Sequence, residues 1–248
     1  MKKALLLSAT AIVGLLLPTL SAAALVPSNL DELPLGEKIV GPVGPDVETT
    51  FINGDGDGIG DLSSSVSCPA GFTSCIPPEN PAGTVYTYIH EVTPGVDLPN
   101  DPPFPSPETV LPIDDARRFQ LGFEAAGFNG VAGYSFSEAE SALDGDEALT
   151  IAETEDGRLV WTIPMSAAWN EGETISFFWQ TSQNPSGPGG EYGLASEEQA
   201  GTAAGPLPVP VESSAVPEPS AIAPLLLFLG LGLIARKGMC DRSLKSHK

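Results

Sequence analysis

Short stretches in the middle of the chain alternate apolar and polar residues. Residues 84–92 (TVYTYIHEV), 118–123 and 174–180 each place every second side chain on the same face. A period of two residues is typical of β-strands, because successive side chains point to opposite sides of a strand. Between Val92 and Ile113 the chain contains many prolines, which a central strand cannot tolerate. We therefore predict short strands joined by loops, one of them long and proline-rich.

Residues 148–164 (ALTIAETEDGRLVWTIP) have the pattern of a β-hairpin. A three-residue loop at 155–157 places Ile151 opposite Trp161, with the next apolar pair outward on the same face. A two-residue loop at Asp156-Gly157 would place both apolar residues of the second strand opposite poorer partners. We therefore predict a type I turn with Gly157 in the left-handed conformation, which produces a G1 bulge.

The order of elements indicates a mainly β fold. Short strands bounded by turn signals predict a single β-sandwich domain, of jelly-roll or Ig-like type, over residues 84–200. One short helix is expected at residues 137–143 (SEAESAL), where Ser137 and Glu140 have capping-box spacing. Residues 25–83 contain scattered Pro, Gly and Asp, and we expect a loop-rich region with short extended pieces there.

The first 24 residues have the layout of a secretory signal peptide. A pair of lysines precedes an apolar stretch, Pro18 interrupts this stretch, and small residues follow at 21–24. This order predicts cleavage after Ala23 or Ala24. A retained membrane helix is the alternative interpretation, although the apolar run is short for a helix that spans a bilayer.

A second apolar segment lies near the C-terminus, at residues 221–235. As a helix it would span about 22 Å, less than the ~30 Å hydrocarbon core of a membrane. We therefore expect a strained or tilted anchor, with Arg236 and Lys237 at the cytoplasmic face. A buried core helix is the alternative, but a Pro-rich linker, expected at residues 201–215, separates this run from the folded domain.

A Pro-Glu-Pro motif stands directly before this apolar run, and residues 216–248 together resemble a PEP-CTERM sorting tail. The signal residues are Val216, Pro217, Glu218, Pro219, Arg236 and Lys237. The two prolines forbid helix and favour an extended peptide, which a protease can grip. The resemblance implies an exosortase, a membrane protease-transpeptidase, as partner. It also implies export through the inner membrane, transient anchoring by the helix, processing near the motif, and a final place at the cell surface or outside the cell.

The charge is distributed unevenly along the chain. Between Leu25 and Pro219 stand 4 of the 11 basic residues and 31 of the 32 acidic residues, a formal net charge of −27. Such a surface repels nucleic acid and anionic lipid, and it attracts cations. We therefore expect no nucleic-acid partner. A solvated extracellular surface accounts for most of these charges.

Cysteine usage agrees with export. Cys68 and Cys75 form an isolated pair in a stretch rich in Gly and Pro (CPAGFTSC). In an oxidising compartment we expect one local disulfide between them. Two cysteines with no further Cys or His nearby make a poor zinc site. Cys240 lies in the basic tail and is expected to have no partner in the exported domain.

The stretch FINGDGDGIGDL is the sharpest internal motif, and it predicts calcium as a cofactor. Its oxygen ligands would come from Asn53, Asp55, Asp57, the Ile59 carbonyl and Asp61, which match positions 1, 3, 5, 7 and 9 of a calcium loop. Ser64 replaces the bidentate glutamate of position 12, so the site is incomplete. The stretch resembles acidic loops of extracellular calcium modules and a short calcium-associated stretch in α-amylases. A flexible acidic turn is the alternative.

Catalytic signals are sparse. The chain has no G-x-S-x-G, H-E-x-x-H, P-loop or dinucleotide motif. His90 is the single histidine of the exported part, and a lone histidine in a strand is usually structural or merely exposed. Seven aromatic residues could stack on sugars, although a place in the core is favoured: Tyr86, Tyr88, Trp161, Trp169, Phe177, Phe178 and Trp179. We therefore predict that this protein is no enzyme.

The sequence as a whole predicts an exported protein with a structural or adhesive role at the cell surface or in an exopolysaccharide matrix. A calcium-assisted carbohydrate-binding module is the first alternative, with exopolysaccharide as its partner. A secreted hydrolase that uses carboxylates is the second alternative.

Overall fold

The computed structural model describes residues 23–41, 43–143, 145 and 148–209, and the statements below concern these residues. They belong to a unit of the chain that ends at Val209. The strands are β1 (Ala23–Leu25), β2 (Ser28–Asn29), β3 (Leu35–Lys38), β4 (Val47–Asn53), β5 (Gly58–Pro69), β6 (Tyr86–Pro94), β7 (Arg118–Leu121), β8 (Phe128–Tyr134), β9 (Thr150–Glu153), β10 (Leu159–Thr162), β11 (Ile175–Thr181), β12 (Pro185–Ala195) and β13 (Ala200–Pro208). The helices are α1 (Phe136–Ala142) and two 3₁₀ turns, η1 (Leu30–Glu32) and η2 (Pro77–Glu79).

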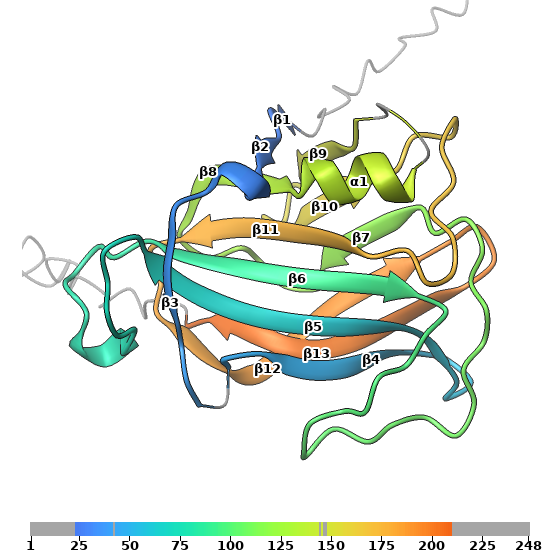
Figure 1. Ribbon diagram of the computed structural model, residues 1–248, viewed down its shortest axis with the longest axis horizontal. Coiled ribbons are helices and arrows are strands. Elements are labelled where there is room, and N and C mark those ends of the chain that lie inside the picture. The colour runs from blue at the N-terminus through green and yellow to red at the C-terminus, as the bar shows by residue number, and fades with distance from the viewer. Residues whose placement is uncertain (1–22, 42, 144, 146–147, 210–248) are drawn as a thin grey trace, which may run out of the picture. The chain divides into compact units, whose positions relative to one another are not determined.

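All thirteen strands are joined by hydrogen bonds into one sheet. Its order is β1-β9-β10-β7-β12-β13-β4-β5-β6-β11-β8-β2, with β3 paired to β5 off this path. The pairs are antiparallel, apart from β2 with β8. The long strands β11, β6 and β5 lie side by side, with the helix α1 next to β11 (Figure 1).

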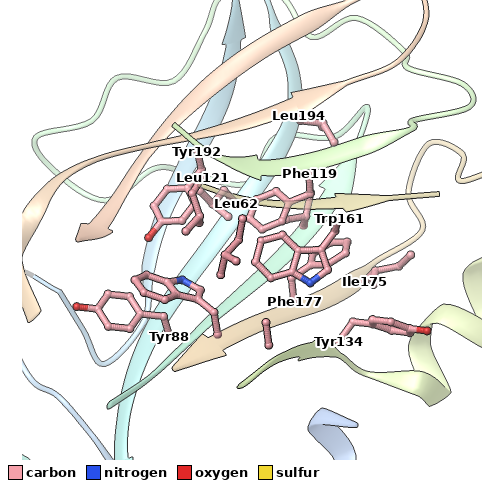
Figure 2. Close-up of a cluster of buried hydrophobic side chains, with 14 of the residues drawn as sticks. Leu62, Tyr88, Phe119, Leu121, Tyr134, Trp161, Ile175, Phe177, Tyr192 and Leu194 are labelled. Atoms are coloured by element: carbon pink, nitrogen blue, oxygen red, sulfur yellow. The ribbon is translucent and has the colours of Figure 1, made fainter. Parts of the chain in front are cut away.

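The sheet curls, so that strands from its two ends meet across one aromatic core. Trp161 on β10 contacts Phe177 on β11 edge to face, with ring centroids 5.9 Å apart. The indole Nε1–H of Trp161 also donates to the backbone carbonyl of Gly133 on β8 (2.9 Å). Phe119 on β7 stacks on Phe177 at 4.7 Å, at the centre of the cluster in Figure 2. These contacts close the curled sheet around its inner face.

The fold is therefore mainly β, as the sequence predicts. The finer prediction of a two-sheet sandwich stays a prediction, because hydrogen bonds link the strands into one continuous sheet. Three stretches predicted as strands, at residues 84–92, 118–123 and 174–180, correspond to β6, β7 and β11.

The hairpin of β9 and β10 has the predicted register. Ile151 lies opposite Trp161, and Gly157 has φ 73°, in the left-handed region. The Gly157 N–H donates to the Thr154 carbonyl (2.9 Å), and the Thr154 N–H donates to the Arg158 carbonyl (2.8 Å). Three residues therefore form the loop, which keeps Trp161 and Ile151 on the core face.

The expectation of a loop-rich region at residues 25–83 is wrong, because β4 and β5 are central strands of the sheet. Leu62 and Val66 fill the core from the inner face of β5, whereas Ser65 and Ser67 are buried on the other face. Both faces of this strand are covered, and many of its side chains are small hydroxyls. Apolar alternation is therefore weak in the sequence (GIGDLSSSVSCP) although the strand is buried.

The predicted linker at residues 201–215 also begins too early, because β13 continues to Pro208 between β12 and β4. Gly and Ala dominate this strand and give no apolar pattern. The reason for one glycine is steric, since a Cβ on Gly205 would lie 2.6 Å from the Tyr192 ring. The Tyr192 hydroxyl donates to the Pro206 carbonyl. Small residues therefore let β13 approach the large side chains of β12.

The short helix lies one residue earlier than predicted. Ser135 is its N-cap and accepts the Glu138 N–H through Oγ (3.2 Å), so the predicted pair Ser137 and Glu140 does not form the cap. The Glu138 carboxylate accepts the backbone N–H of Ser176 on β11 instead (2.6 Å). Glu138 thus joins the helix to the sheet.

Candidate functional site

The acidic motif predicted to bind calcium begins at the turn between β4 and β5. Asn53 ends β4, and its Oδ1 accepts the backbone N–H groups of Asp55 (2.9 Å) and Asp57 (3.0 Å). Gly56 takes the left-handed conformation (φ 92°) that the tight turn requires. The structure therefore brings three of the five predicted ligands to one turn. The side-chain oxygen of Asn53 already accepts two backbone N–H groups there.

The other two predicted ligands lie in strand β5. The Ile59 carbonyl accepts the N–H of Gly95 (2.9 Å). The Asp61 carboxylate accepts the N–H of Leu98 (3.1 Å). Both groups therefore bind the loop that follows β6, and the five predicted ligands do not converge on one point. In the part of the chain that the structure describes, no group of three or more His, Cys, Asp or Glu could hold a metal ion. Calcium binding stays a prediction.

The loop that holds Asp61 spans residues 95–111 and is called the proline-rich loop below. Its far end pairs with the start of β5, because Gly58 donates to the Thr109 carbonyl and accepts the Leu111 N–H, both at 2.8 Å. A Cβ on Gly58 would lie 2.7 Å from the Pro107 ring, so a glycine is needed at this close approach. Both ends of the loop are thus fixed to β5.

The middle of the proline-rich loop is fixed to β4. Asp101 donates its N–H to the Glu48 carbonyl (3.1 Å) and accepts the Glu48 N–H through Oδ2 (3.2 Å). The Thr50 hydroxyl donates to the Asp97 carboxylate and accepts from the Asn100 side-chain amide (2.8 Å). These hydrogen bonds hold the middle of the loop against the strand.

Three carboxylates gather under this loop: Glu48, Asp61 and Asp97, called the acidic cluster below. Asp61 is only 3% exposed. Its pKa is raised to about 7: burial is the largest cause, Glu48 and Asp97 also raise the pKa, and the Leu98 N–H acts in the opposite direction. None of the ion pairs among the described residues involves these carboxylates. Sequence reasoning missed this cluster, because its members are far apart in the chain and acidic residues are common throughout.

His90 on β6 is buried on the opposite, inner face of the sheet. Its Nδ1 lies 3.0 Å from the Ser64 hydroxyl, and its Nε2 accepts the indole N–H of Trp179 (3.4 Å). Because Nε2 accepts, the proton of the neutral ring is on Nδ1 and points at Ser64. Burial lowers the pKa of His90 to about 3. A base that activates serine must accept the serine proton, so this pair is a structural one.

All seven aromatic residues considered for sugar stacking are buried, as the favoured alternative predicts. Tyr88 stacks on Trp179 inside the core, with ring centroids 4.6 Å apart. Among the described residues, Phe136 is the only large aromatic side chain that is strongly exposed (40%). The strip of exposed Tyr or Trp that would favour a carbohydrate-binding module is not formed by these seven residues.

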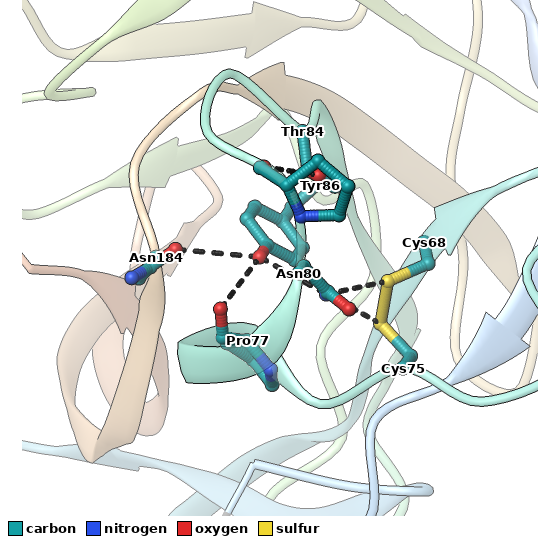
Figure 3. Close-up of a disulfide and its surroundings, with 8 residues drawn as sticks. Cys68, Cys75, Pro77, Asn80, Thr84, Tyr86 and Asn184 are labelled. Carbon is teal, nitrogen blue, oxygen red and sulfur yellow. Dashed lines mark hydrogen bonds between the residues drawn. A yellow bond between two sulfur atoms is a disulfide. The ribbon is translucent and has the colours of Figure 1, made fainter.

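The structure has a disulfide between Cys68 and Cys75, with a Cα–Cα distance of 5.7 Å. It is the pair expected from the sequence. Asn80 lies between this disulfide and the Tyr86 hydroxyl (Figure 3), and its amide is 3.2 Å from the Cys68 sulfur and 3.1 Å from the Tyr86 oxygen. The loop closed by the disulfide is therefore held against β6.

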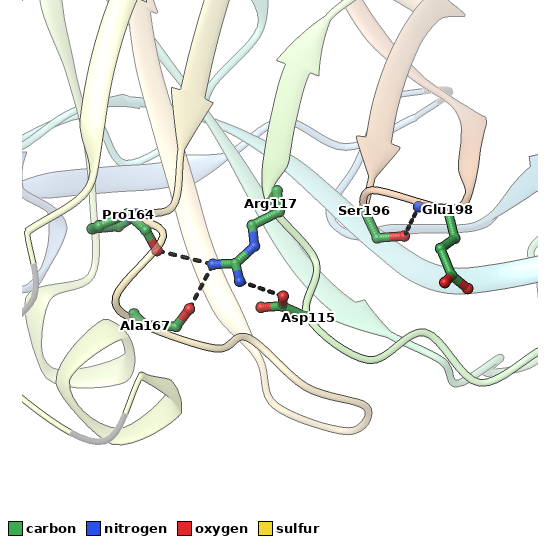
Figure 4. Close-up of polar contacts among 6 residues, drawn as sticks. All are labelled: Asp115, Arg117, Pro164, Ala167, Ser196 and Glu198. Carbon is green, nitrogen blue, oxygen red and sulfur yellow. Dashed lines mark hydrogen bonds and ion pairs between the residues drawn. The ribbon is translucent and has the colours of Figure 1, made fainter.

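An acidic hollow of about 330 Å³ lies between residues 112–115 and 196–199. Arg117 fixes one side of it, since its guanidinium donates to the carbonyls of Pro164 (2.9 Å) and Ala167 (2.5 Å) and pairs with Asp115 (Figure 4). Arg117 therefore fastens two loops to each other, which is a positioning role.

The comparisons with known proteins add no relative: no family model, curated protein or solved structure matches this chain. The class that the structure itself defines is a mainly β domain with a curled antiparallel sheet and a local disulfide.

Several predictions from the sequence fall outside the described residues. These are the body of the signal peptide, the apolar segment at 221–235, Cys240 and the sorting residues Val216 to Pro219 with Arg236 and Lys237. Within the described ranges, the helices are too short or too polar to span a bilayer.

Proposed function

We propose that this chain is an exported protein whose C-terminal tail is processed by an exosortase, and that its β domain has a structural or adhesive role at the cell surface or in the extracellular matrix. The observation that carries the proposal is the order of the Pro-Glu-Pro motif, the apolar run and the basic pair after the domain. The chain leaves the last strand at Pro208, only eight positions before Val216. The sorting signal thus follows a folded domain directly.

The chemistry of the domain supports a place outside the cytoplasm. A disulfide between Cys68 and Cys75 persists in an oxidising compartment and is rare in the cytosol. The exported part has a formal net charge of −27, which keeps the chain soluble and attracts cations. These two features are independent of the tail, and both agree with the proposed destination.

A non-enzymatic role is supported by how the domain uses its reactive groups. His90 is neutral, enclosed in the core and hydrogen-bonded to Ser64 and Trp179. Arg117 fastens loops through backbone carbonyls. Both residues stabilise the fold, and neither is placed to transfer a proton to a bound substrate.

We also infer that the architecture is that of a β-sandwich, in which two halves of the curled sheet face each other. The inference is supported by Trp161 and Phe177, which pack against each other across the core.

Mass spectrometry of the mature C-terminus tests the proposal. The full-length chain is produced in a bacterium that encodes an exosortase, and in the same strain without that enzyme. We expect the mature chain to end close to Val216–Pro219 only when the enzyme is present. A variant with Pro217→Ala and Pro219→Ala should keep the complete tail, because the motif is no longer rigid and extended. A mature wild-type chain that still ends at Lys248 would refute the sorting claim.

A further inference from the structure

The two end strands of the sheet are neighbours in the sequence. The hydrogen-bonded order begins with β1 and ends with β2, and only two residues separate these strands along the chain. Leu25 on β1 lies opposite Ile151 on β9, whereas Ser28 on β2 lies opposite Gly133 on β8 (Figure 1). One short segment thus bridges the two edges of the curled sheet. These edges, formed by β8 and β9, are called the seam below.

The part of this segment that remains after the predicted cleavage of the signal peptide is residues 25–32, called the N-terminal clasp below. Its Asn29 Oδ1 accepts the first N–H of helix α1 (3.2 Å). The Asp31 carboxylate accepts the next N–H of the helix (3.0 Å) and the hydroxyl of the N-cap residue Ser135 (2.6 Å). The clasp is therefore fixed to the start of α1 as well as to both strands of the seam.

The seam fits the backbone of the clasp closely at one glycine. A Cβ on Gly133 would lie 1.8 Å from the Ser28 carbonyl oxygen and 2.6 Å from the Phe178 ring. The Gly133 carbonyl also accepts the indole N–H of Trp161 on β10 (2.9 Å). A larger residue at this position would therefore keep the clasp out of the seam.

Polar contacts hold the clasp, with little apolar burial. Of residues 25–32, which the structure describes throughout, none is buried, and only Leu25 packs against the apolar core. Val26 is 89% exposed, more than any other large apolar side chain among the described residues. Segments with few buried contacts open with a small free energy while the rest of the domain stays folded. The clasp can therefore leave the seam without unfolding the sheet.

An open seam would expose the edges of two strands. Their free backbone N–H and C=O groups bind an extended peptide as an additional strand. The hinge that carries the clasp is short, because Leu33 and Pro34 alone separate η1 from β3. Leu33 is extended (ψ 126°), and the following proline restricts it to this conformation. A short, stiff hinge favours the exchange of a segment between two copies over its return to the same chain.

The surface beside the seam also suits a second copy. A hollow of about 360 Å³ lies between Pro27 and helix α1, and its lining is mainly apolar, with Tyr134 and Phe136 as the largest side chains. Phe136 is 40% exposed, and Val26 stands next to Pro27 in the clasp. Exposed apolar side chains thus gather where a second copy would approach, and exchange would cover them.

We propose that the seam binds the N-terminal clasp of a second copy of this chain, so that two copies exchange their clasps and form a dimer. The inference deepens the proposed structural role and rests on it in one step, since export and cleavage free the clasp from the residues before it. Each copy fills the seam of the other with the contacts seen in the single chain. The net charge of −27 opposes the approach of two copies, so the dimer should increase with ionic strength.

Two complementary variants test the exchange. In the donor, Gly133→Ala blocks the seam and leaves the clasp intact. In the acceptor, Asn29→Ala with Asp31→Ala weakens the clasp and leaves the seam intact. Both full-length chains are exported with their own signal peptide, purified and analysed by sedimentation. We expect the 1:1 mixture to contain at least about five times as much dimer as either variant alone, because only the mixture combines an intact clasp with an open seam. A donor that also carries the two clasp replacements is the matched control and should form no dimer with the acceptor.

The length of the hinge provides a second measurement in an otherwise wild-type chain. Four Gly and Ser residues inserted between Leu33 and Pro34 let the clasp return to its own seam without strain. This insertion should lower the dimer fraction at least about fivefold, measured at about 1 mM protein and high salt. The same insertion after Gly83, in an exposed turn, should leave the dimer fraction unchanged.

Thermal melting of each variant checks that it folds, and the hinge measurement decides if the donor does not. Absence of a dimer from both the mixture and the wild-type chain would overturn the inference. A dimer that forms equally with the control donor, or that ignores the length of the hinge, would overturn it as well, because the contact would then lie elsewhere. Tail processing takes no part in these measurements. A tail that is never processed refutes the proposed sorting and leaves the exchange to be judged by the dimer alone.

Discussion

The two faces of the sheet at β5 and β6 bury polar groups in different ways. On the inner face, His90 binds the neutral Ser64 and Trp179. On the outer face, Asp61 lies under the proline-rich loop, beside two further carboxylates. The inner group is a base whose pKa burial lowers to about 3, and the outer group is an acid whose pKa burial raises to about 7. Burial favours the neutral form of both groups, although their chemistry is opposite.

The difference between the faces lies in their partners. His90 is surrounded by aromatic rings, with Tyr192 at 4.3 Å and Phe119 at 5.8 Å between centroids, so no other charge acts on it. Asp61 faces Glu48 from β4 and Asp97 from the proline-rich loop, and both raise its pKa. The inner face is therefore stable when its base is neutral, and the outer face is stable when its acid keeps a proton. The two faces should respond to pH in opposite directions.

The largest effect is expected at the inner face on acidification. The unfolded chain binds a proton at His90 near pH 6.5, whereas the folded chain does so only near pH 3. The free energy of unfolding should therefore fall as the pH drops below 6.5, by about 1.4 kcal/mol per pH unit from this group. Chemical denaturation at several pH values would compare wild type with His90→Gln, in which this contribution is lost.

NMR titration of the His90 ring provides a control that needs no variant. We expect the ring to remain neutral in the folded protein down to about pH 4, with its proton on Nδ1. A ring that titrates between pH 6 and 7 in the folded state would contradict the proposed difference between the two faces, because the inner face would then tolerate a charge.

A smaller effect of opposite sign is expected at the outer face. The folded chain keeps a proton on Asp61 up to about pH 7, whereas the unfolded chain loses it near pH 3.8. The stabilisation is complete below pH 3.8 and is lost as the pH rises through about 7. Asp61→Asn should therefore be more stable than wild type at pH 8, by about 1–2 kcal/mol, since the amide oxygen can still accept the Leu98 N–H.

Denaturation of Asp61→Asn and of a control, Asp114→Asn, at pH 8 and pH 4 measures this difference. The exposed Asp114 should change stability by less than about 0.5 kcal/mol at either pH. A gain for Asp61→Asn that is as large at pH 4 as at pH 8 would mean that ionisation of Asp61 is not its cause.

The two faces also explain what the sequence can predict. The inner face has alternating large side chains, and the pattern predicts β6, β7, β11 and the β9–β10 hairpin with its register. The neighbouring strands β4, β5 and β13 are missed, because many of their buried positions hold Thr, Ser, Gly and Ala. A small buried residue leaves no apolar signal, since what buries it is a partner distant in the sequence.

The candidate site shows the same limit. Local spacing identifies the turn of Asn53, Asp55 and Asp57, where all contacts lie within five residues. It also groups Asp61 with them, whereas strand β5 places the Asp61 carboxylate where it accepts the Leu98 N–H. Local spacing finds a turn, whereas the acidic cluster depends on which strands pair.

The smallest effect is expected at the turn itself, where calcium is the open prediction. Asn53 Oδ1 accepts two backbone N–H groups and the Ile59 carbonyl accepts the Gly95 N–H, so a five-ligand site would require both sets of bonds to break. We therefore expect calcium to bind only weakly, through the Asp55 and Asp57 carboxylates alone. Calorimetric titration of wild type, Asp55→Ala and Asp61→Asn distinguishes the turn from the acidic cluster. Heat that is lost in Asp55→Ala but kept in Asp61→Asn would place the ion at the turn. Heat that is lost in Asp61→Asn would place the ion under the proline-rich loop. A bound cation, and not a proton on Asp61, would then neutralise the acidic cluster.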